Sequence, residues 1–476
     1  MKVLNSMFYP KSVAIVGASA NPLGWGGTDY VINLRKIGYL GRVYPVNPKA
    51  VEVQGFKSYP DVKSIPEIPD IAIIAVSAPI VPHVLRDCIS KGVKNVHIFS
   101  SGFAETGEEE GKKLDDEITE IIRNSDLRVV GPNCMGIWVP ASKFAGWAVP
   151  PQGTGSLAFL SQSGGHGEML TAYAQPLGVY FSKIISFGNA KGLQAIDFLE
   201  YLETDPDTKT ISCYFEGIKD GNIVAQLIRR INHTKPVVVW KGGLTESGAR
   251  AVSSHTGSMA GEKKSWDAFY AQTGAIRVSS LDEIIDVAML FANLKQPRGR
   301  NVLILGGGGG NSVAVTDTCG REGLVVPTIT EATRKELSSF IRFAGNSVRN
   351  PLDVWQTQEE FGAFRHTIEI AMSDPNIDIV LLDRFVGIYG DAEEPNYKRQ
   401  DDEINNYIIE LAHEKNSKPM VVSMNLRSNN PRTAATGVET LTKFAKAGVP
   451  AFPSPASASR ALSRFVSYFE FQDAEK

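Results

Sequence analysis

Short runs of β-branched and other apolar residues alternate with longer amphipathic stretches along the whole chain. Apolar runs bounded by glycine, proline or asparagine predict buried strands, and stretches with apolar residues three or four positions apart predict helices. In the first part of the chain the expected strands lie at 12–17, 42–48, 71–77, 96–102 and 128–133. Regular alternation of strand and helix is typical of a parallel sheet in an α/β protein.

Two interruptions divide this alternation. Proline and glycine gather at 140–155, and the segment KQPRGR at 295–300 has the composition of a linker. Between the interruptions strands are expected at 156–161, 181–188, 211–217, 236–243 and 275–279, and after them at 301–310, 377–383, 419–425 and 450–455. The sequence therefore predicts an α/β protein with three domains, at 1–140, 150–295 and 300–476.

Composition agrees with several globular domains and excludes some functions. A chain of 476 residues is longer than a single core usually supports, and 43% hydrophobic with 21% charged residues is typical of a globular protein. A net charge of -3 provides no positive electrostatic potential to attract the phosphate backbone of a nucleic acid. No segment reaches transmembrane length. We therefore expect a protein that binds neither nucleic acid nor a membrane.

The cysteines indicate the compartment. Four occur, far apart and without a CxxC pair, so neither a zinc site nor a disulfide framework is expected. No histidine pair has the spacing of metal ligands either. We expect no bound metal and a reducing, cytoplasmic location.

Four of the expected strands end in glycine-rich turns, at 17–27, 161–167, 242–243 and 306–312. Such turns direct backbone N–H groups and a helix N-terminus toward an anion, so phosphate is the expected ligand. A single turn of this kind is as often a tight connection between strand and helix as it is a phosphate site. Four in one chain favour a phosphate-containing ligand.

The first turn, Gly17-Ala18-Ser19, lacks the second glycine of the GxGxxG dinucleotide fingerprint. The next strand ends in Lys49, where an acid would be needed to hold the ribose of NAD. A lysine there suits a terminal phosphate, such as the 3'-phosphate of coenzyme A or the extra phosphate of NADP, although a solvated surface lysine would look the same. No P-loop is present, because the glycine-lysine segment at 107–114 has the wrong spacing. If the protein uses ATP, another chain must bind it.

His255 differs from the other six histidines in its surroundings. It is expected in a loop of small residues after the strand at 236–243, and small neighbours let an imidazole swing and a phosphate approach. Gly257 and Gly261 make such motion easy. Glu216 ends another strand and could fix the tautomer of the ring by accepting a proton from one nitrogen. The turn at 161–165 could hold a phosphoryl group against His255.

Seven motifs resemble those of the ADP-forming acetyl-CoA synthetases, relatives of succinyl-CoA synthetase. In chain order they are GASANP, YPVNPK, SSGF, GPNCMG, LSQSGG, YFEGIKDG and SSHTGSMAG. The resemblance covers about the first 290 residues. It implies a Rossmann-like CoA-binding domain followed by two flavodoxin-like ligase-type domains, all three doubly wound.

The resemblance also implies a role for each matching residue. His255 would carry the phosphoryl group, with Glu216 as its orienting partner. The phosphate would be held by Ser161, Ser163, Gly164 and Gly165. Coenzyme A would be bound by Gly17, Ala18, Ser19, Lys49, Ser77, Ser100, Ser101, Gly102 and Asn133.

In this family an acyl-CoA and phosphate give an acyl phosphate, whose phosphoryl group passes to the histidine and then to ADP. The resemblance therefore implies a separate ATP-grasp beta subunit that holds ATP or ADP with Mg²⁺, in an assembly of two of each chain. The small-molecule substrates would be a small carboxylic acid or its acyl-CoA, and phosphate.

Three alternatives compete with this interpretation. A non-catalytic CoA-binding regulatory or scaffold protein would keep Lys49 and the first turn without needing His255, Glu216 and the turn at 161–165 together. An NADP oxidoreductase would need a Tyr-Lys catalytic pair that the sequence does not offer. A protein acetyltransferase would need a fused transferase domain, for which no residues remain.

Overall fold

A computed structural model divides the chain into two compact units. The first comprises Met1–Gln175 and Tyr180–Leu281, and the second comprises Pro176–Val179 and Asp282–Lys476. The residues described by the structure are 2–20, 26–145, 153–256, 263–306, 308–342, 344–354, 360–386, 395–415, 417–426 and 430–475, with the backbone alone given for 2, 3, 253–256 and 425.

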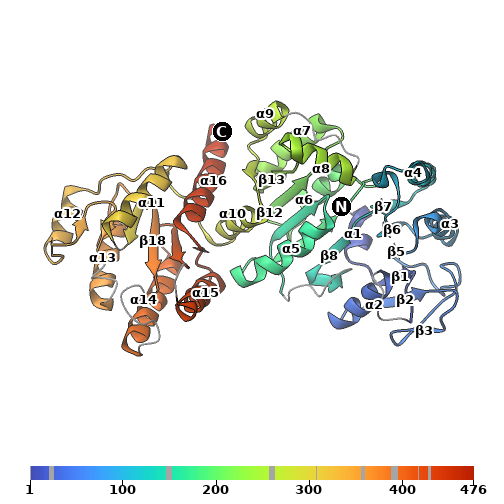
Figure 1. The fold of residues 1–476 in the computed structure, drawn as a ribbon, viewed down its shortest axis with the longest axis horizontal. Helices are drawn as coiled ribbons and strands as arrows, with labels where there is room; N and C mark the ends of the chain where they lie inside the picture. The colour runs from blue at the N-terminus through green and yellow to red at the C-terminus, as the bar shows by residue number, and fades with distance from the viewer. Residues whose placement is uncertain are drawn as a thin grey trace. The chain divides into compact units, whose positions relative to one another are not determined.

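The first sheet contains the five strands expected from the sequence, all parallel, in the order β2-β1-β5-β6-β7 (Figure 1). They are β1 (Ser12–Val16), β2 (Arg42–Val46), β5 (Ile71–Ile74), β6 (Asn95–Ile98) and β7 (Arg128–Val130). The helices of this part are α1 (Lys2–Phe8), α2 (Gly27–Lys36), α3 (Val81–Lys91) and α4 (Glu109–Arg123), and β3 (Glu52–Val53) pairs with β4 (Phe56–Lys57). Every residue of β1, β5 and β6 is buried, as expected for parallel strands covered on both faces.

The second sheet has seven strands in the order β14-β13-β12-β10-β11-β8-β9. Five of them were expected: β10 (Leu157–Ser161), β11 (Phe181–Ser186), β12 (Thr210–Phe215), β13 (Val237–Lys241) and β14 (Ile276–Val278). The helices that accompany them are α5 (Gly164–Ala174), α6 (Ala195–Thr204), α7 (Gly221–Asn232), α8 (Glu246–Thr256) and α9 (Lys263–Thr273).

Two strands of this sheet, β8 (Gly136–Val139) and β9 (Phe144–Ala145), were not expected. Strand β8 pairs antiparallel with β11, so that Trp138 lies opposite Ile184, and β9 pairs antiparallel with β8. Proline and glycine suggested an interruption here, but Pro140 begins a tight turn between two short strands. The chain thus joins the second sheet before the proline- and glycine-rich segment begins.

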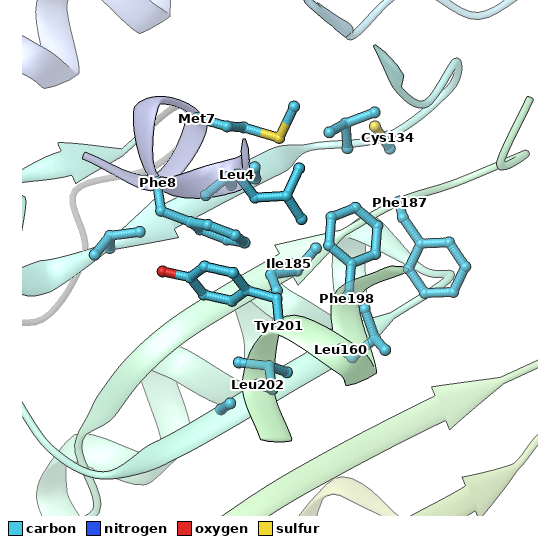
Figure 2. Close-up of a cluster of buried hydrophobic side chains, with 14 of the residues drawn as sticks. Leu4, Met7, Phe8, Cys134, Leu160, Ile185, Phe187, Phe198, Tyr201 and Leu202 are labelled. Atoms are coloured by element: carbon cyan, nitrogen blue, oxygen red, sulfur yellow. The ribbon is translucent and has the colours of Figure 1, made fainter. Parts of the chain in front are cut away.

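One apolar core is shared by the first two sheets. It contains Val13 and Ile15 of β1 together with Leu160 of β10 and Phe198 of α6. Figure 2 shows helix α1 packed on α6, with the rings of Phe8 and Tyr201 stacked at a centroid distance of 4.4 Å. Burying a phenylalanine contributes about 2 kcal/mol of folding free energy. The shared core explains why the first two expected domains form one compact unit.

The third sheet has six strands in the order β16-β17-β15-β18-β19-β20, parallel except for the pair β16 and β17. The strands are β15 (Val302–Gly306), β16 (Ser347–Val348), β17 (Leu352–Asp353), β18 (Ile379–Phe385), β19 (Met420–Asn425) and β20 (Ala451–Phe452). The helices are α10 (Leu281–Asn293), α11 (Gly309–Arg321), α12 (Glu331–Ser338), α13 (Phe361–Ser373), α14 (Pro395–His413), α15 (Pro431–Lys446) and α16 (Pro455–Ala474).

Helix α10 belongs to the second unit from Asp282 onward, although the sequence suggested that it closes the second domain. The carboxylate of Glu283 pairs with Arg460 and Arg464 of α16, each at 3.0 Å, and Phe291 packs on Phe465. These contacts fasten α10 to the helix that ends the chain. Across the described ranges, no helix combines the length and apolarity needed to cross a bilayer.

Candidate active site

The turn after β10 is built by its own serine side chains. The backbone N–H of Ser163 donates to Oγ of Ser161 at 3.1 Å, and that hydroxyl donates to the carbonyl of Ser163 at 2.7 Å. Ser163 then caps helix α5, because its Oγ accepts from the N–H of His166 at 3.4 Å. The first N–H groups of a helix have no partner within it, so Gly164 and Gly165 present donors to an anion. Ser161 is fully buried and supports the turn from below.

A cavity of about 290 Å³ opens at this helix N-terminus. Five of the residues predicted from the sequence line it: Ser101, Asn133, Ser163, Gly164 and Gly165. The first two were predicted for coenzyme A and the others for phosphate. The structure therefore brings two of the nine residues predicted for coenzyme A and three of the four predicted for phosphate to one cavity in the first unit. Five further lining residues were missed: Phe99, Cys134, Met135, Gln162 and Asn189.

A chain of hydrogen bonds fixes the rim of this cavity. Nδ2 of Asn133 donates to Oδ1 of Asn189 at 3.4 Å, and Nδ2 of Asn189 donates to Glu105 at 2.6 Å. The other oxygen of Glu105 accepts from the N–H of Gly102 at 2.7 Å. Gly188 is required beside Asn189, because a Cβ there would lie 2.3 Å from the carbonyl oxygen of Pro132. The loops of both sheets are thus locked to each other.

Glu216 follows β12 and is buried beside the same turn. Oε1 of Gln162 accepts hydrogen bonds from the N–H groups of Glu216 and Gly217, the latter at 3.0 Å. The hydroxyl of Tyr214 donates to Oε1 of Glu216 at 3.2 Å. The structure therefore places the predicted carboxylate next to the predicted phosphate turn, with Gln162 as the link between them.

Lys241, at the end of β13, places a buried ammonium group near this carboxylate. Its Nζ donates to the backbone carbonyl of Glu216 at 2.9 Å and also to that of Gly242. Burial lowers the pKa of Lys241 to about 8, and the charge of Glu216 partly opposes this shift. The lysine holds the strand end that carries Glu216.

The predicted CoA residues of the first domain follow the carboxyl ends of β1, β2, β5, β6 and β7. Gly17 has φ of 95°, and a Cβ there would lie 2.3 Å from the carbonyl oxygen of Ala75. Asn47 links the first turn to Lys49, because Nδ2 donates to the carbonyl of Ala18 at 2.8 Å while Oδ1 accepts from the N–H of Lys49 at 2.9 Å. The side chain of Lys49 is exposed and can reach a ligand.

The other predicted CoA residues differ in how their side chains are used. Ser19 bonds to Thr28 at the start of α2, with its N–H 2.9 Å from Oγ1 of the threonine. Ser77 is exposed, whereas the hydroxyl of Ser100 is buried and donates to the carbonyl of Val76. The continuation of the first turn, with Trp25, lies outside the described residues.

Comparison with known proteins assigns both parts of the first unit to known domain families. Residues 11–140 match the family model for a CoA binding domain, and residues 154–291 match that for a succinyl-CoA ligase like flavodoxin domain. The alpha subunit of acetate--CoA ligase [ADP-forming] I from Pyrococcus furiosus is 34% identical over 99% of both chains. The chain belongs to the family of ADP-forming acyl-CoA synthetase alpha subunits. The alpha subunit of acetate--CoA ligase [ADP-forming] II from the same organism is 36% identical over 80% of this chain and 82% of that one.

A solved structure supports the fold over nearly the whole length. The dinucleotide forming acetyl-coenzyme A synthetase 1 of Ca. Korarchaeum cryptofilum, in complex with phosphate and ADP, is 30% identical with a TM-score of 0.84. The match covers 99% of this chain and 98% of that one. The expected Rossmann-like and flavodoxin-like architecture of this family is therefore confirmed, as is the resemblance seen in the motifs.

The segment that carries His255 differs from the expectation. Residues 246–256 form helix α8, so His255 lies in its last turn and not in a loop. Oγ1 of Thr245 accepts from the N–H of Gly248 at 3.1 Å, and Glu246 pairs with Arg250 one turn later. These signals of a helix start were overlooked because the small residues suggested a loop. The side chain of His255, and Gly257 and Gly261, lie outside the described residues.

The buried His97 of β6 makes the folding stability of the first unit depend on pH. Burial lowers its pKa from 6.5 to about 4, and a hydrogen bond to the carbonyl of Cys134 partly opposes this shift. Between pH 6.5 and 4 the unfolded state therefore binds a proton at His97 that the folded state does not bind. The free energy of unfolding falls by roughly 3 kcal/mol as the pH drops through this range.

Chemical denaturation at several pH values checks this prediction. The unfolding free energy of the first unit should fall more steeply with acidification in the parent than in His97→Gln, whose amide keeps a donor but does not titrate. Equal slopes in this window would show that His97 is not the group responsible.

Proposed function

We propose that this chain is the CoA-binding, phosphohistidine-carrying subunit of a reversible ADP-forming acyl-CoA synthetase. The reaction is acyl-CoA + ADP + phosphate = carboxylic acid + CoA + ATP. The observation that supports it most is the single cavity lined by Ser101 and Asn133 on one side and by Ser163, Gly164 and Gly165 on the other. Such a cavity can hold the thiol end of coenzyme A next to a phosphate.

The chemistry proceeds in three transfers. Phosphate held at the N-terminus of α5 attacks the thioester carbonyl, which releases CoA as its thiol and forms an acyl phosphate. A ring nitrogen of His255 then attacks the phosphorus, and the carboxylate leaves as the free acid. The phosphoryl group passes from His255 to ADP on the partner subunit.

We assign a role in these transfers to each group of residues. The N–H groups of Gly164 and Gly165 stabilise the negative charge of the phosphate by donating hydrogen bonds to it. Glu216 accepts a hydrogen bond from one ring N–H of His255, which leaves the other nitrogen unprotonated and nucleophilic. Gln162 and Lys241 keep Glu216 in place through the contacts described above. We assign the CoA site to residues 1–140 and the phosphoryl chemistry to residues 150–295, in the cytoplasm.

The nucleotide belongs to a second chain in this proposal. The sequence carries no P-loop, and the described residues contain no group of three or more His, Cys, Asp or Glu that could hold a metal ion. We propose an ATP-grasp beta subunit that holds ATP or ADP with Mg²⁺, with two copies of each chain. The relatives from Pyrococcus furiosus are likewise named as alpha subunits.

Assays of acyl-CoA formation test the division of labour. The purified chain, given ATP, CoA and a panel of carboxylic acids, should form no acyl-CoA, and addition of the right ATP-grasp chain should start the reaction. Full activity of the isolated chain would mean that it contains a nucleotide site, and the proposal would fail.

Lys49 is expected to contact the 3'-phosphate of coenzyme A. Calorimetry should then show tighter binding of CoA than of dephospho-CoA, and Lys49→Ala should reduce that preference by about tenfold or less, because the side chain is exposed. Lys57→Ala, which removes another exposed lysine of the same domain, should leave the preference unchanged. Tight binding of NADP without binding of CoA would refute the assignment.

A further inference from the structure

The backbone at Met135 is held from both sheets of the first unit. Its N–H donates to Oγ of Ser186 in β11 at 3.2 Å, and its carbonyl accepts from the hydroxyl of Tyr30 in α2 at 3.1 Å. The preceding carbonyl, that of Cys134, lies 3.1 Å from Nε2 of His97. The side chains of Ser186, Tyr30 and His97 are all buried. Met135 therefore sits on a backbone that has little freedom to shift.

The side chain of Met135 lies over the first residue of helix α5. A Cβ added to Gly164 would lie 2.4 Å from Cγ of Met135, a distance that real atoms do not reach. A Cβ added to the neighbouring Gly165 would meet nothing within 4 Å. Met135 therefore leaves no room for a larger residue at position 164, and its side chain lies beside the first residue of the helix that forms the predicted phosphate site.

We propose that Met135 sets the size of the acyl group that this chain accepts. This inference rests on the proposed function, because the acyl carbon must lie between the thiol of CoA and the phosphate at α5. Met135 lines the cavity, together with Phe99 and Cys134. None of the described residues that line the cavity carries a charge, so the lining offers no ion-pair partner to a charged acyl substituent.

Truncation of Met135 should enlarge the site and keep it enlarged. Cavities persist when the surrounding structure cannot collapse, and the hydrogen bonds to Ser186 and Tyr30 prevent collapse here. Met135→Ala should therefore accept acids with bulkier, branched acyl groups. In the presence of the ATP-grasp chain, its kcat/KM for isobutyrate relative to acetate should rise by about tenfold or more over the parent.

The matched control is Met169→Ala, because Met169 is a methionine of α5 that does not line the cavity and has 44% of its surface exposed. It should keep the substrate profile of the parent. An unchanged profile in Met135→Ala, or the same change in both variants, would overturn the inference. Calorimetry with CoA shows whether each variant is folded. If the parent itself forms no acyl-CoA from any acid with its partner, the proposed function fails and not this inference alone.

A double substitution tests the contact independently of substrate size. Gly164→Ala should lower kcat/KM for acetate, because the new methyl group collides with Met135. Adding Met135→Ala should restore a large part of the loss, since the Cβ atoms of the two residues would then be 3.4 Å apart, close to ordinary contact. Restoration supports the placement of Met135 over the start of α5. A double variant as impaired as Gly164→Ala alone would contradict it.

Discussion

His255→Ala is expected to abolish acyl-CoA formation by the complete synthetase. Loss of a nucleophile that carries a covalent intermediate lowers turnover by at least about a thousandfold. The measurement is steady-state formation of acyl-CoA with the ATP-grasp chain present, together with incorporation of label from γ-labelled ATP. The parent chain should acquire an acid-labile, base-stable phosphoryl group, and the variant none.

The matched control is His233→Ala, because His233 is an exposed histidine at the end of α7 in the same unit. It should keep both activity and labelling. CoA binding should survive in both variants, since neither residue belongs to the first domain. Equal labelling of His255→Ala and the parent would show that another residue carries the phosphoryl group.

Glu216→Gln is expected to slow phosphorylation while leaving CoA binding intact. The amide keeps the size of the side chain but loses the charge that orients and stabilises the ring of the histidine. Loss of such a supporting group typically costs about 10- to 100-fold in activity. Rapid-quench measurement of labelled phosphohistidine gives the rate, and calorimetry gives CoA affinity.

Glu200→Gln removes an exposed carboxylate of α6 and serves as the control. It should phosphorylate at the rate of the parent. If Glu216→Gln were as fast as the parent, the carboxylate would have no role in the transfer. If it also lost CoA binding, its role would be structural, through the turn that Gln162 supports.

The parallel sheets could be predicted because their physical signal is local. A buried parallel strand favours a run of apolar residues such as Ile71–Ile74, and each strand of the first sheet contains buried apolar residues of this kind. Strands β8 and β9 were missed because they are short and flank Pro140. The pairing of β8 with β11 also depends on a partner that is remote in sequence.

The candidate site was predictable where a turn requires a particular residue. Gly17 and Gly164 are glycines because a Cβ would collide with a neighbour, and both fall in motifs that the sequence shows. Gln162 and Asn189 were missed because their roles depend on contacts across the fold, to Glu216 and Asn133 respectively. Helix α8 was missed because serine and threonine suggested a loop, whereas Thr245 supplies a helix start.

The central claim is that this chain alone joins thioester chemistry to a histidine. Its most direct test needs no partner: the isolated chain is mixed with acetyl-CoA and radiolabelled phosphate in the absence of any nucleotide. Free CoA and acetate should appear in amounts equal to a labelled phosphohistidine, found in the peptide that contains His255. Release of CoA without label on the chain, or label on a peptide that lacks His255, would contradict it.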